Sequence, residues 1–229
     1  MLLFNLYFSF DSICDYCFEV VYVGAIHPKH LEIAKIYLEA GKSVLCEKPL
    51  CMNVKETEEL IQLARSKNVF LMEGIWSRCI PAYKVVFHFS KGRIITISTS
   101  MKAVQQSIEG GEIGEVKQVV ATFGKNYFRN ISFDRNFPEG FANEGDRFHK
   151  KEMGGGSILD LGIYPIQLAQ LVFGGEMPRV LSAGHLGQGG CDDNSSITLV
   201  YSNGRTATLV THSRVHLPNE VTSYNNAIS

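Results

Sequence analysis

The sequence has little that would direct the protein to nucleic acid, to a membrane or to the secretory pathway. Its 229 residues include 22 Lys and Arg and 23 Asp and Glu, a formal net charge of −1, without a run of like charge. Such a balance gives no attraction to nucleic acid or anionic lipid. The apolar start at residues 1–4 follows no basic residue and is too short to span a bilayer. We therefore expect a cytoplasmic protein.

The chain also lacks the cysteine spacing of a disulfide framework or a zinc site. The six cysteines are scattered: Cys14, Cys17, Cys46, Cys51, Cys79 and Cys191. The single C-x-x-C at residues 14–17 has no second pair and no histidine pair to complete four metal ligands. We expect reduced thiols and no bound metal.

What the sequence does contain first is an alternation of strand and helix patterns. Three short apolar runs predict buried strands at residues 20–23, 43–46 and 69–72. The first intervening helix begins near Pro28 and ends at Gly41, and the second is capped by Asn53 with Glu56 three residues later. Right-handed crossovers at this spacing predict a parallel sheet of the Rossmann-like α/β class.

The pattern changes near residue 75, where we place a domain boundary between residues 1–75 and 76–229. The second part predicts an α+β domain with an open, mainly antiparallel sheet. Its expected elements are a hairpin over 84–101, a helix over 102–108, a strand over 116–123, a long loop over 125–153, a helix from Gly154 to Phe173, and strands over 179–186, 197–201 and 206–214. The Asn203-Gly204 pair predicts a tight turn between the last two strands.

Two stretches carry candidate chemistry. The strand at 43–46 is followed by Glu47, Lys48 and Pro49, and the carboxyl ends of parallel strands are where ligands bind. The alternative is an exposed ion pair of little consequence.

The second stretch is the glycine-rich start of the helix that follows residue 153. Asp160 and Tyr164 lie four residues apart and share one face of that helix. Buried polar groups need partners. The alternative to a functional role is a Tyr ring packed in the core, with Asp160 capping the helix or pairing with an arginine.

Together, Glu-Lys-Pro at 47–49 and G-G-G-x-x-x-D-x-G-x-Y-P at 154–165 resemble the oxidoreductase family of glucose–fructose oxidoreductase and inositol dehydrogenase. That family joins a Rossmann domain to a domain with an open antiparallel sheet. Its usual helix motif has histidine where this chain has Tyr164. The tyrosine, His-Pro-x-His at 27–30 and Trp-Ser-Arg at 76–78 are similar to the dimeric dihydrodiol dehydrogenase branch, which also oxidises D-xylose.

The resemblance covers roughly residues 19–83 and 102–220 and implies a role for each matching residue. Tyr164 would be the general acid/base, and Lys48 would place an ammonium group near it, which lowers the pKa of a phenol from ~10. The substrate would contact Asp160, Trp76 and Arg78, and the cofactor would contact Tyr22, His30, Glu47 and Lys48. For His30 the alternative is an ordinary residue of the first helical turn.

The resemblance further implies NADP, or NAD, as the cofactor, hydride transfer to or from a small diol or sugar, and a homodimer. Three departures stand against it. The G-x-G-x-x-G fingerprint and first βαβ unit of a dinucleotide-binding domain are missing, since residues 1–18 contain no glycine. Residues 84–101 interrupt a family helix, and the chain after residue 220 does not continue as the family does.

We interpret 1–18, 84–101 and 221–229 as translated non-coding or alternative-exon sequence, foreign to a genuine family core. We accordingly expect this polypeptide to be unstable or inactive, and the alternative function is a non-catalytic remnant or interaction module of the same fold.

Overall fold

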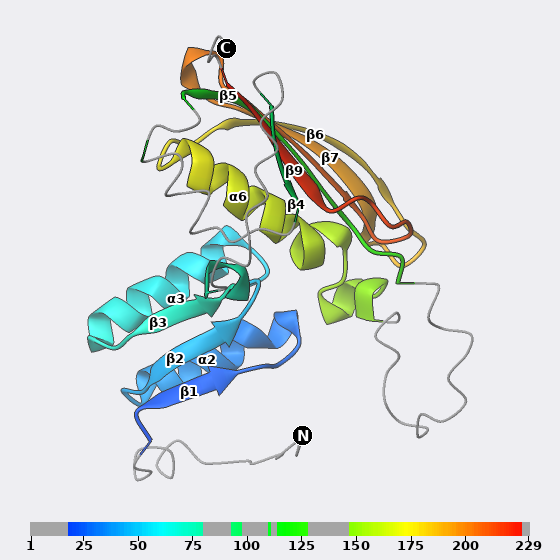
Figure 1. Ribbon diagram of the computed structural model, residues 1–229. Coiled ribbons are helices and arrows are strands. Elements are labelled where there is room, and N and C mark those ends of the chain that lie inside the picture. The colour runs from blue at the N-terminus through cyan, green and yellow to red at the C-terminus, as the bar shows by residue number, and fades with distance from the viewer. Residues whose placement is uncertain (1–17, 80–92, 98–109, 111–113, 128–146, 226–229) are drawn as a thin grey trace. The chain divides into compact units, whose positions relative to one another are not determined.

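The computed structural model describes residues 18–79, 93–97, 110, 114–127 and 147–225 (Figure 1). The chain divides into two compact units, Met1–Ile75 and Trp76–Ser229, and each is described by itself.

The first unit is a parallel sheet with two helices. Its strands pair in the order β1-β2-β3, with Val23 opposite Cys46 and Glu47 opposite Gly74. Its elements are β1 (Val20–Val23), the 3-10 turn η1 (His27–Lys29), α2 (His30–Glu39), β2 (Ser43–Glu47), α3 (Val54–Lys67) and β3 (Leu71–Gly74). All three strands end at one edge, which is where the Glu47-Lys48-Pro49 stretch begins.

Local sequence signals account for the ends of both helices. The amide of Lys42 donates to the carbonyl of Tyr37 after α2, and Asn53 caps α3 by accepting a hydrogen bond from the Glu56 amide. The two helices and the sheet then bury one apolar cluster, in which Ala34, Leu38, Val44, Cys46 and Leu60 are fully enclosed.

Two strand predictions need correction. Residues 20–23 form a strand but not a buried one, because Val20 is 59% and Tyr22 61% exposed. Within the described residues β1 pairs with β2 alone, so its other edge packs against no described strand. The third strand is Leu71–Gly74 and not 69–72, because the amide of Val69 is used in ending α3 at the Ala64 carbonyl.

The second unit is a six-stranded sheet with one long helical segment against it (Figure 1). The strands run in the order β4-β9-β5-β8-β7-β6, and all neighbours are antiparallel except β5 and β8. Its elements are η2 (Trp76–Cys79), β4 (Arg93–Ile97), β5 (Val116–Gly124), η4 (Lys151–Met153), the π-helical turn η5 (Ile158–Gly162), α6 (Ile163–Phe173), β6 (Arg179–Leu186), β7 (Asp192–Val200), η6 (Ser202–Gly204), β8 (Thr206–His212) and β9 (Glu220–Asn225).

Helix α6 lies on the sheet because its apolar face matches the inward face of the strands. Leu168, Ala169 and Phe173 pack against a buried layer from β5, β7 and β8 that includes Val119 and Leu209. The segment Lys151–Phe173 is long and apolar enough to cross a membrane, but more than half of its most apolar window is buried here. It is the core helix of this unit.

Most strand predictions for this unit are confirmed, with local corrections. The turn between β7 and β8 has Asn203 at φ 57° and Gly204 at φ 71°, as a type I′ hairpin requires. The helix after Gly154 begins only at Ile158 and opens with a π-helical turn. The fold class predicted from sequence, a Rossmann-like parallel sheet followed by a mainly antiparallel α+β domain, is confirmed.

The first arm of the hairpin predicted over 84–101 lies outside the described residues, so its pairing with the second arm stays a prediction. The second arm forms β4, and β4 pairs with β9. Strand β7 begins at Asp192, five residues before the prediction, because Asp192 pairs with Leu186 of β6 and Asn194 with His185, with a register shift between the two pairs. The helix predicted over 102–108 and residues 128–146 of the predicted loop lie outside the described residues.

Candidate functional site

At the carboxyl edge of the first sheet, polar side chains from two strands meet. The Tyr22 hydroxyl of β1 donates to Oε1 of Glu47 in β2 across 2.5 Å, and Oε2 of Glu47 accepts from the backbone amide of Lys48 at 3.2 Å. The peptide bond between Lys48 and Pro49 is cis. The hydrogen bond to Glu47, aided by desolvation and by the negative charge of that carboxylate, raises the pKa of Tyr22 to about 12. This edge therefore presents a carboxylate and a protonated phenol.

His30 is fully enclosed behind that edge. Its Nδ1 lies 2.8 Å from the carbonyl oxygen of Pro49, and its Nε2 lies 2.9 Å from that of Ala25. The ring therefore joins the loop after β1 to the turn after β2. A side chain with no exposed surface can influence a ligand here only through the loops that it holds. This arrangement fits the alternative interpretation of His30 as an ordinary structural residue of the first helical turn.

In the second unit, Tyr164 occupies the first turn of α6 among aromatic rings. The indole Nε1–H of Trp76 donates to its phenol oxygen at 2.6 Å, and the two ring centroids lie 5.5 Å apart. Phe123 of β5 lies 5.3 Å from Tyr164 between centroids. The phenol is half-buried and accepts a hydrogen bond, so its own O–H is directed away from the indole. Arg78 is exposed in the same short helix as Trp76.

Asp160 lies in the π-helical turn and is 6% exposed. Its Oδ2 accepts from the Tyr127 hydroxyl at 3.0 Å, and its Oδ1 lies 3.3 Å from a guanidinium nitrogen of Arg147. Tyr127 is stacked on Phe148 at 3.8 Å between centroids, and Arg147 lies over the same Phe148 ring. The predicted alternative, that Asp160 pairs with an arginine, describes these contacts, and the arginine is Arg147.

The helix that carries Asp160 and Tyr164 is fixed at its start by strand β7. Oδ2 of Asp192 accepts from the Ser157 hydroxyl at 2.5 Å and from the Ile158 amide at 2.9 Å. Ser157 is also 2.9 Å from the Thr211 hydroxyl of β8. A carboxylate supplied by a distant strand thus takes the place of a local N-cap.

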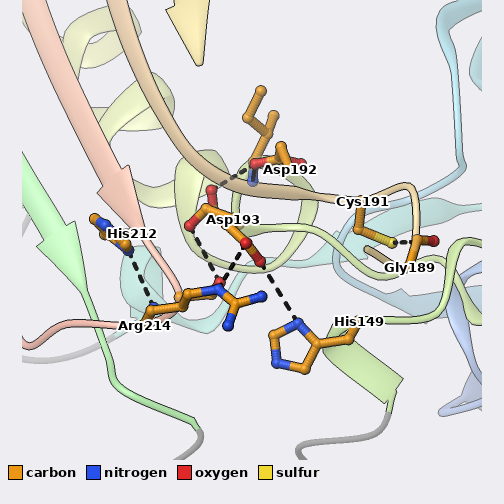
Figure 2. A network of polar contacts seen from close by, with 10 residues as sticks. His149, Gly189, Cys191, Asp192, Asp193, His212 and Arg214 are labelled. Atoms are coloured by element: carbon orange, nitrogen blue, oxygen red, sulfur yellow. Dashed lines mark hydrogen bonds and ion pairs between the residues drawn. The ribbon is translucent and has the colours of Figure 1, made fainter. Parts of the chain in front are cut away.

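The next residue, Asp193, holds the segment that provides Arg147 (Figure 2). Its buried carboxylate lies 2.6 Å from Nε of Arg214 and 3.7 Å from Nδ1 of His149. The Arg214 amide in turn donates to Nδ1 of His212. Two successive aspartates therefore fix both parts of the Asp160 surroundings, the helix through Asp192 and the 147–149 segment through Asp193.

The sequence singled out Asp160, Tyr164 and Trp76 as candidate site residues and did not indicate the side chains that contact Asp160. Tyr127 and Arg147 lie in the stretch 125–153, whose length predicted a role at a binding site. No motif indicated the partners of the helix start, Asp192 and Thr211. Among the described residues no group of three or more His, Cys, Asp or Glu side chains could hold a metal ion. Lys48 belongs to the first unit and Tyr164 to the second.

The chain has a Rossmann-like sheet with a polar carboxyl edge, followed by a helix that carries Asp160 and Tyr164 on an open sheet. These features define the class of protein as a two-domain oxidoreductase. Comparison with known protein families identifies the same class. Residues 6–75 match the oxidoreductase family with an NAD-binding Rossmann fold, and residues 101–224 match the GFO/IDH/MocA C-terminal domain. The chain belongs to the GFO/IDH/MocA oxidoreductase family.

Similar proteins of known annotation include trans-1,2-dihydrobenzene-1,2-diol dehydrogenases. The enzyme of Xenopus tropicalis is 38% identical over 216 residues, which cover 93% of this chain and 56% of the relative. The enzyme of Oryctolagus cuniculus is 35% identical over 81% of this chain and 47% of the relative. The chain spans about half the length of the curated relatives it matches.

Solved structures with the same fold include a 3-ketoreductase from Actinomadura kijaniata in complex with NADP and TDP-benzene. It has a TM-score of 0.70 at 24% identity and covers 94% of this chain and 57% of its own. The aldose-aldose oxidoreductase from Caulobacter crescentus has a TM-score of 0.69 at 24% identity, and the match covers 90% of this chain and 54% of that protein.

The matched ranges correct one interpretation made from the sequence. Residues 6–18 and 221–224 fall inside the two family matches, so they are not foreign to the family core. Strand β9 also lies within the sheet, between β4 and β5. Residues 84–100 do fall between the two matches.

Proposed function

We propose that the chain is the site-bearing part of an NADP-dependent dehydrogenase that transfers hydride between the nicotinamide and a small diol or sugar. The observation that carries the proposal is the Tyr164 phenol, hydrogen-bonded by Trp76 on the helix that also holds Asp160. The names of the two curated relatives described above, both trans-dihydrodiol dehydrogenases, support a cyclic diol as substrate.

The carboxyl edge of the first sheet fits the nicotinamide riboside half of such a cofactor. Glu47 offers carboxylate oxygens to ribose hydroxyls, and Tyr22, 61% exposed, borders the same edge. Gly74 lets the ends of β2 and β3 approach closely at this edge, because a Cβ at that position would lie 3.1 Å from the Cys46 carbonyl oxygen. When bound, the nicotinamide ring accepts or donates the hydride. Lys48 is the cationic residue that we assign to this edge.

The protein's own residues would handle the proton. In the oxidation direction the phenolate of Tyr164 takes the hydroxyl proton as the substrate carbon loses its hydride, and in reduction the phenol returns it. The hydrogen bond from Trp76 would hold charge on this oxygen, and the family resemblance assigns Lys48 the role of the cationic residue in the reaction. Asp160, fixed by Tyr127 and Arg147, would accept a hydrogen bond from a second substrate hydroxyl and orient the ring.

The test combines cofactor binding with turnover. Trp76 is the sole tryptophan, so its fluorescence reports a ligand that approaches Tyr164. We expect NADPH to quench this emission, and oxidation of a trans-dihydrodiol or D-xylose to produce NADPH absorbance. Tyr164→Phe and Lys48→Met should each lower kcat at least a hundredfold, as expected for loss of a general acid/base or its electrostatic partner. A wild-type kcat in either variant would contradict the catalytic role assigned to the residue that it replaces.

A second function is tested in the same titration. If neither NADPH nor NADH at millimolar concentration changes the emission, and no substrate is turned over, the non-catalytic interaction module is the better description.

We also propose a homodimer formed through the open sheet. Strand β6 is exposed along its whole length, and Val180, Leu181 and Leu186 are 58%, 49% and 67% exposed. Exposed apolar side chains on one strand are typical of an association surface. Light scattering after size-exclusion chromatography should give twice the chain mass, and Leu181→Glu should give the monomer. A monomeric wild type would contradict this.

A further inference from the structure

The short helix η2 is attached to helix α6 by two adjacent hydrogen bonds. Trp76 donates to the Tyr164 oxygen at 2.6 Å, and the Ser77 hydroxyl donates to Oε1 of Gln167 at 2.7 Å. Tyr164 and Gln167 are three residues apart, so they lie on one face of α6. Consecutive residues of η2 therefore bind consecutive turns of α6, and each bond fixes the register of the other.

Gln167 is an energetically unfavourable residue at its position. It is 7% exposed, and among the described residues its Nε2 has no hydrogen-bond partner. A buried amide donor without a partner is destabilising, whereas an apolar side chain of the same shape would be neutral or better. Most of the surrounding helix is apolar, with Leu168 and Ala169 buried beside it. Within the part of the chain that the structure describes, the one side-chain hydrogen bond that a glutamine makes here and a methionine could not is the bond to Ser77.

We propose that Ser77 and Gln167 form a positioning pair that holds the Trp76 indole against the Tyr164 phenol. The proposal rests on the function assigned above, in which Tyr164 exchanges the substrate proton. An N–H donated to the phenol oxygen stabilises the negative charge that appears there when the proton leaves. Ser77 and Gln167 contact neither the reacting oxygen nor the indole N–H, and they act by fixing where Trp76 lies.

The first measurement is tryptophan fluorescence, which needs no activity. In Gln167→Met and Ser77→Ala, Trp76 should become more accessible to iodide and its emission should move to longer wavelength. Both variants remove the same hydrogen bond, between Ser77 and Gln167. The double variant should therefore show the same emission and iodide accessibility as each single variant. The matched control is Gln170→Met, the same change at an exposed position of the same helix. Unchanged emission in both single variants, or effects that add, would overturn the pair.

The second measurement follows the same emission as the pH is raised. A tyrosinate 5.5 Å from the indole quenches it by energy transfer, so the Tyr164 ionisation appears as a quenching step that Tyr164→Phe abolishes. We expect the midpoint of this step to move to higher pH in Gln167→Met and Ser77→Ala, since the phenolate loses a donor. A midpoint equal to wild type in both variants would overturn the proposal even if the chain folds normally.

Turnover supplies the last measurement. Both variants should lower kcat roughly tenfold or more with KM little changed, because displacement of a catalytic group acts on the transition state. Altered fluorescence with wild-type kcat would overturn the positioning role and leave the dehydrogenase assignment intact. A chain without any cofactor binding or turnover would instead overturn the assigned function, and the fluorescence and pH measurements would still decide whether the pair exists.

Discussion

The carboxylate of Asp192, the first residue of β7, accepts a hydrogen bond from the amide of Ile158, the first residue of η5, across 2.9 Å. The first amides of a helix have no partner within it and carry partial positive charge. The sheet thereby supplies both the acceptor and the negative charge that this helix start needs. The placement of Asp160 and Tyr164 consequently depends on Asp192, which lies 34 positions after Ile158 in the chain.

Asp192→Ala should therefore destabilise the second unit by about 2 kcal/mol, since it removes a helix cap and leaves the buried Ser157 hydroxyl with one partner fewer. Urea unfolding followed by the emission of Trp76, which lies in this unit, would measure the loss. Glu152→Ala, an exposed acidic residue near the same helix, is the control and should stay within about 0.5 kcal/mol of wild type. Equal stability of the two variants would contradict the capping role.

Gly156 should tolerate no side chain, for two separate reasons. Its φ is +122°, a conformation that L-residues rarely adopt, and a Cβ there would overlap Oδ1 of Asp192. We expect Gly156→Ala to lose about 2 kcal/mol or more in the same unfolding experiment. Gly175→Ala, where a Cβ would meet nothing within 4 Å, should differ from wild type by less than about 1 kcal/mol. A Gly156→Ala protein as stable as Gly175→Ala would show that the backbone of the loop before η5 has a different conformation.

The sequence predicted what depends on local patterns. The Asn53 cap, the Gly41 helix end and the Asn203-Gly204 turn each require specific residues at fixed spacing, and all three are present in the structure. Asp160 and Tyr164 were found for the same reason, since helical periodicity alone places them on one face.

Contacts between distant residues could not be read in this way. Nothing near Asp160 in the sequence indicates Tyr127, and nothing near β4 indicates its partner β9, because strand pairing is set by tertiary packing. The exposure of Tyr22 was missed for a related reason. An apolar run predicts a strand, but which of its neighbours cover it depends on the sheet order.

The thiols of Cys46 in β2 and of Cys51 in the segment after it should be chemically inert. Burial raises the pKa of Cys46 to about 12 and that of Cys51 to about 11, and both side chains are enclosed. At pH 8 a thiol of pKa 12 is roughly one part in ten thousand thiolate, the reactive form. Peptide mass spectrometry after brief alkylation should find Cys79, which is exposed, labelled long before either. Comparable labelling of Cys46 and Cys79 in the native protein would contradict the burial of this strand.

The phenol of Tyr22 should remain protonated well above the pH at which ordinary tyrosines ionise. With its pKa raised to about 12 by the hydrogen bond to Glu47, roughly a tenth of it is ionised at pH 11, against nine tenths at the usual value of ~10. Absorbance of tyrosinate, taken as wild type minus Tyr22→Phe, isolates this group. Glu47→Gln should return the midpoint toward 10, because the amide accepts the hydrogen bond without the negative charge. Glu73→Gln, whose carboxylate binds the Leu50 amide, should leave it in place.

The same shift gives the sign of a stability effect. A raised pKa in the folded state means that the protonated phenol is the form that folding favours, so the Tyr22–Glu47 contact contributes fully below pH 10. Its contribution should decline as the pH rises from about 10 through about 12, and the difference in unfolding free energy between wild type and Tyr22→Phe should shrink over that interval. A difference that stays constant from pH 8 to pH 12 would mean that the phenol packs against Glu47 without donating its proton to it.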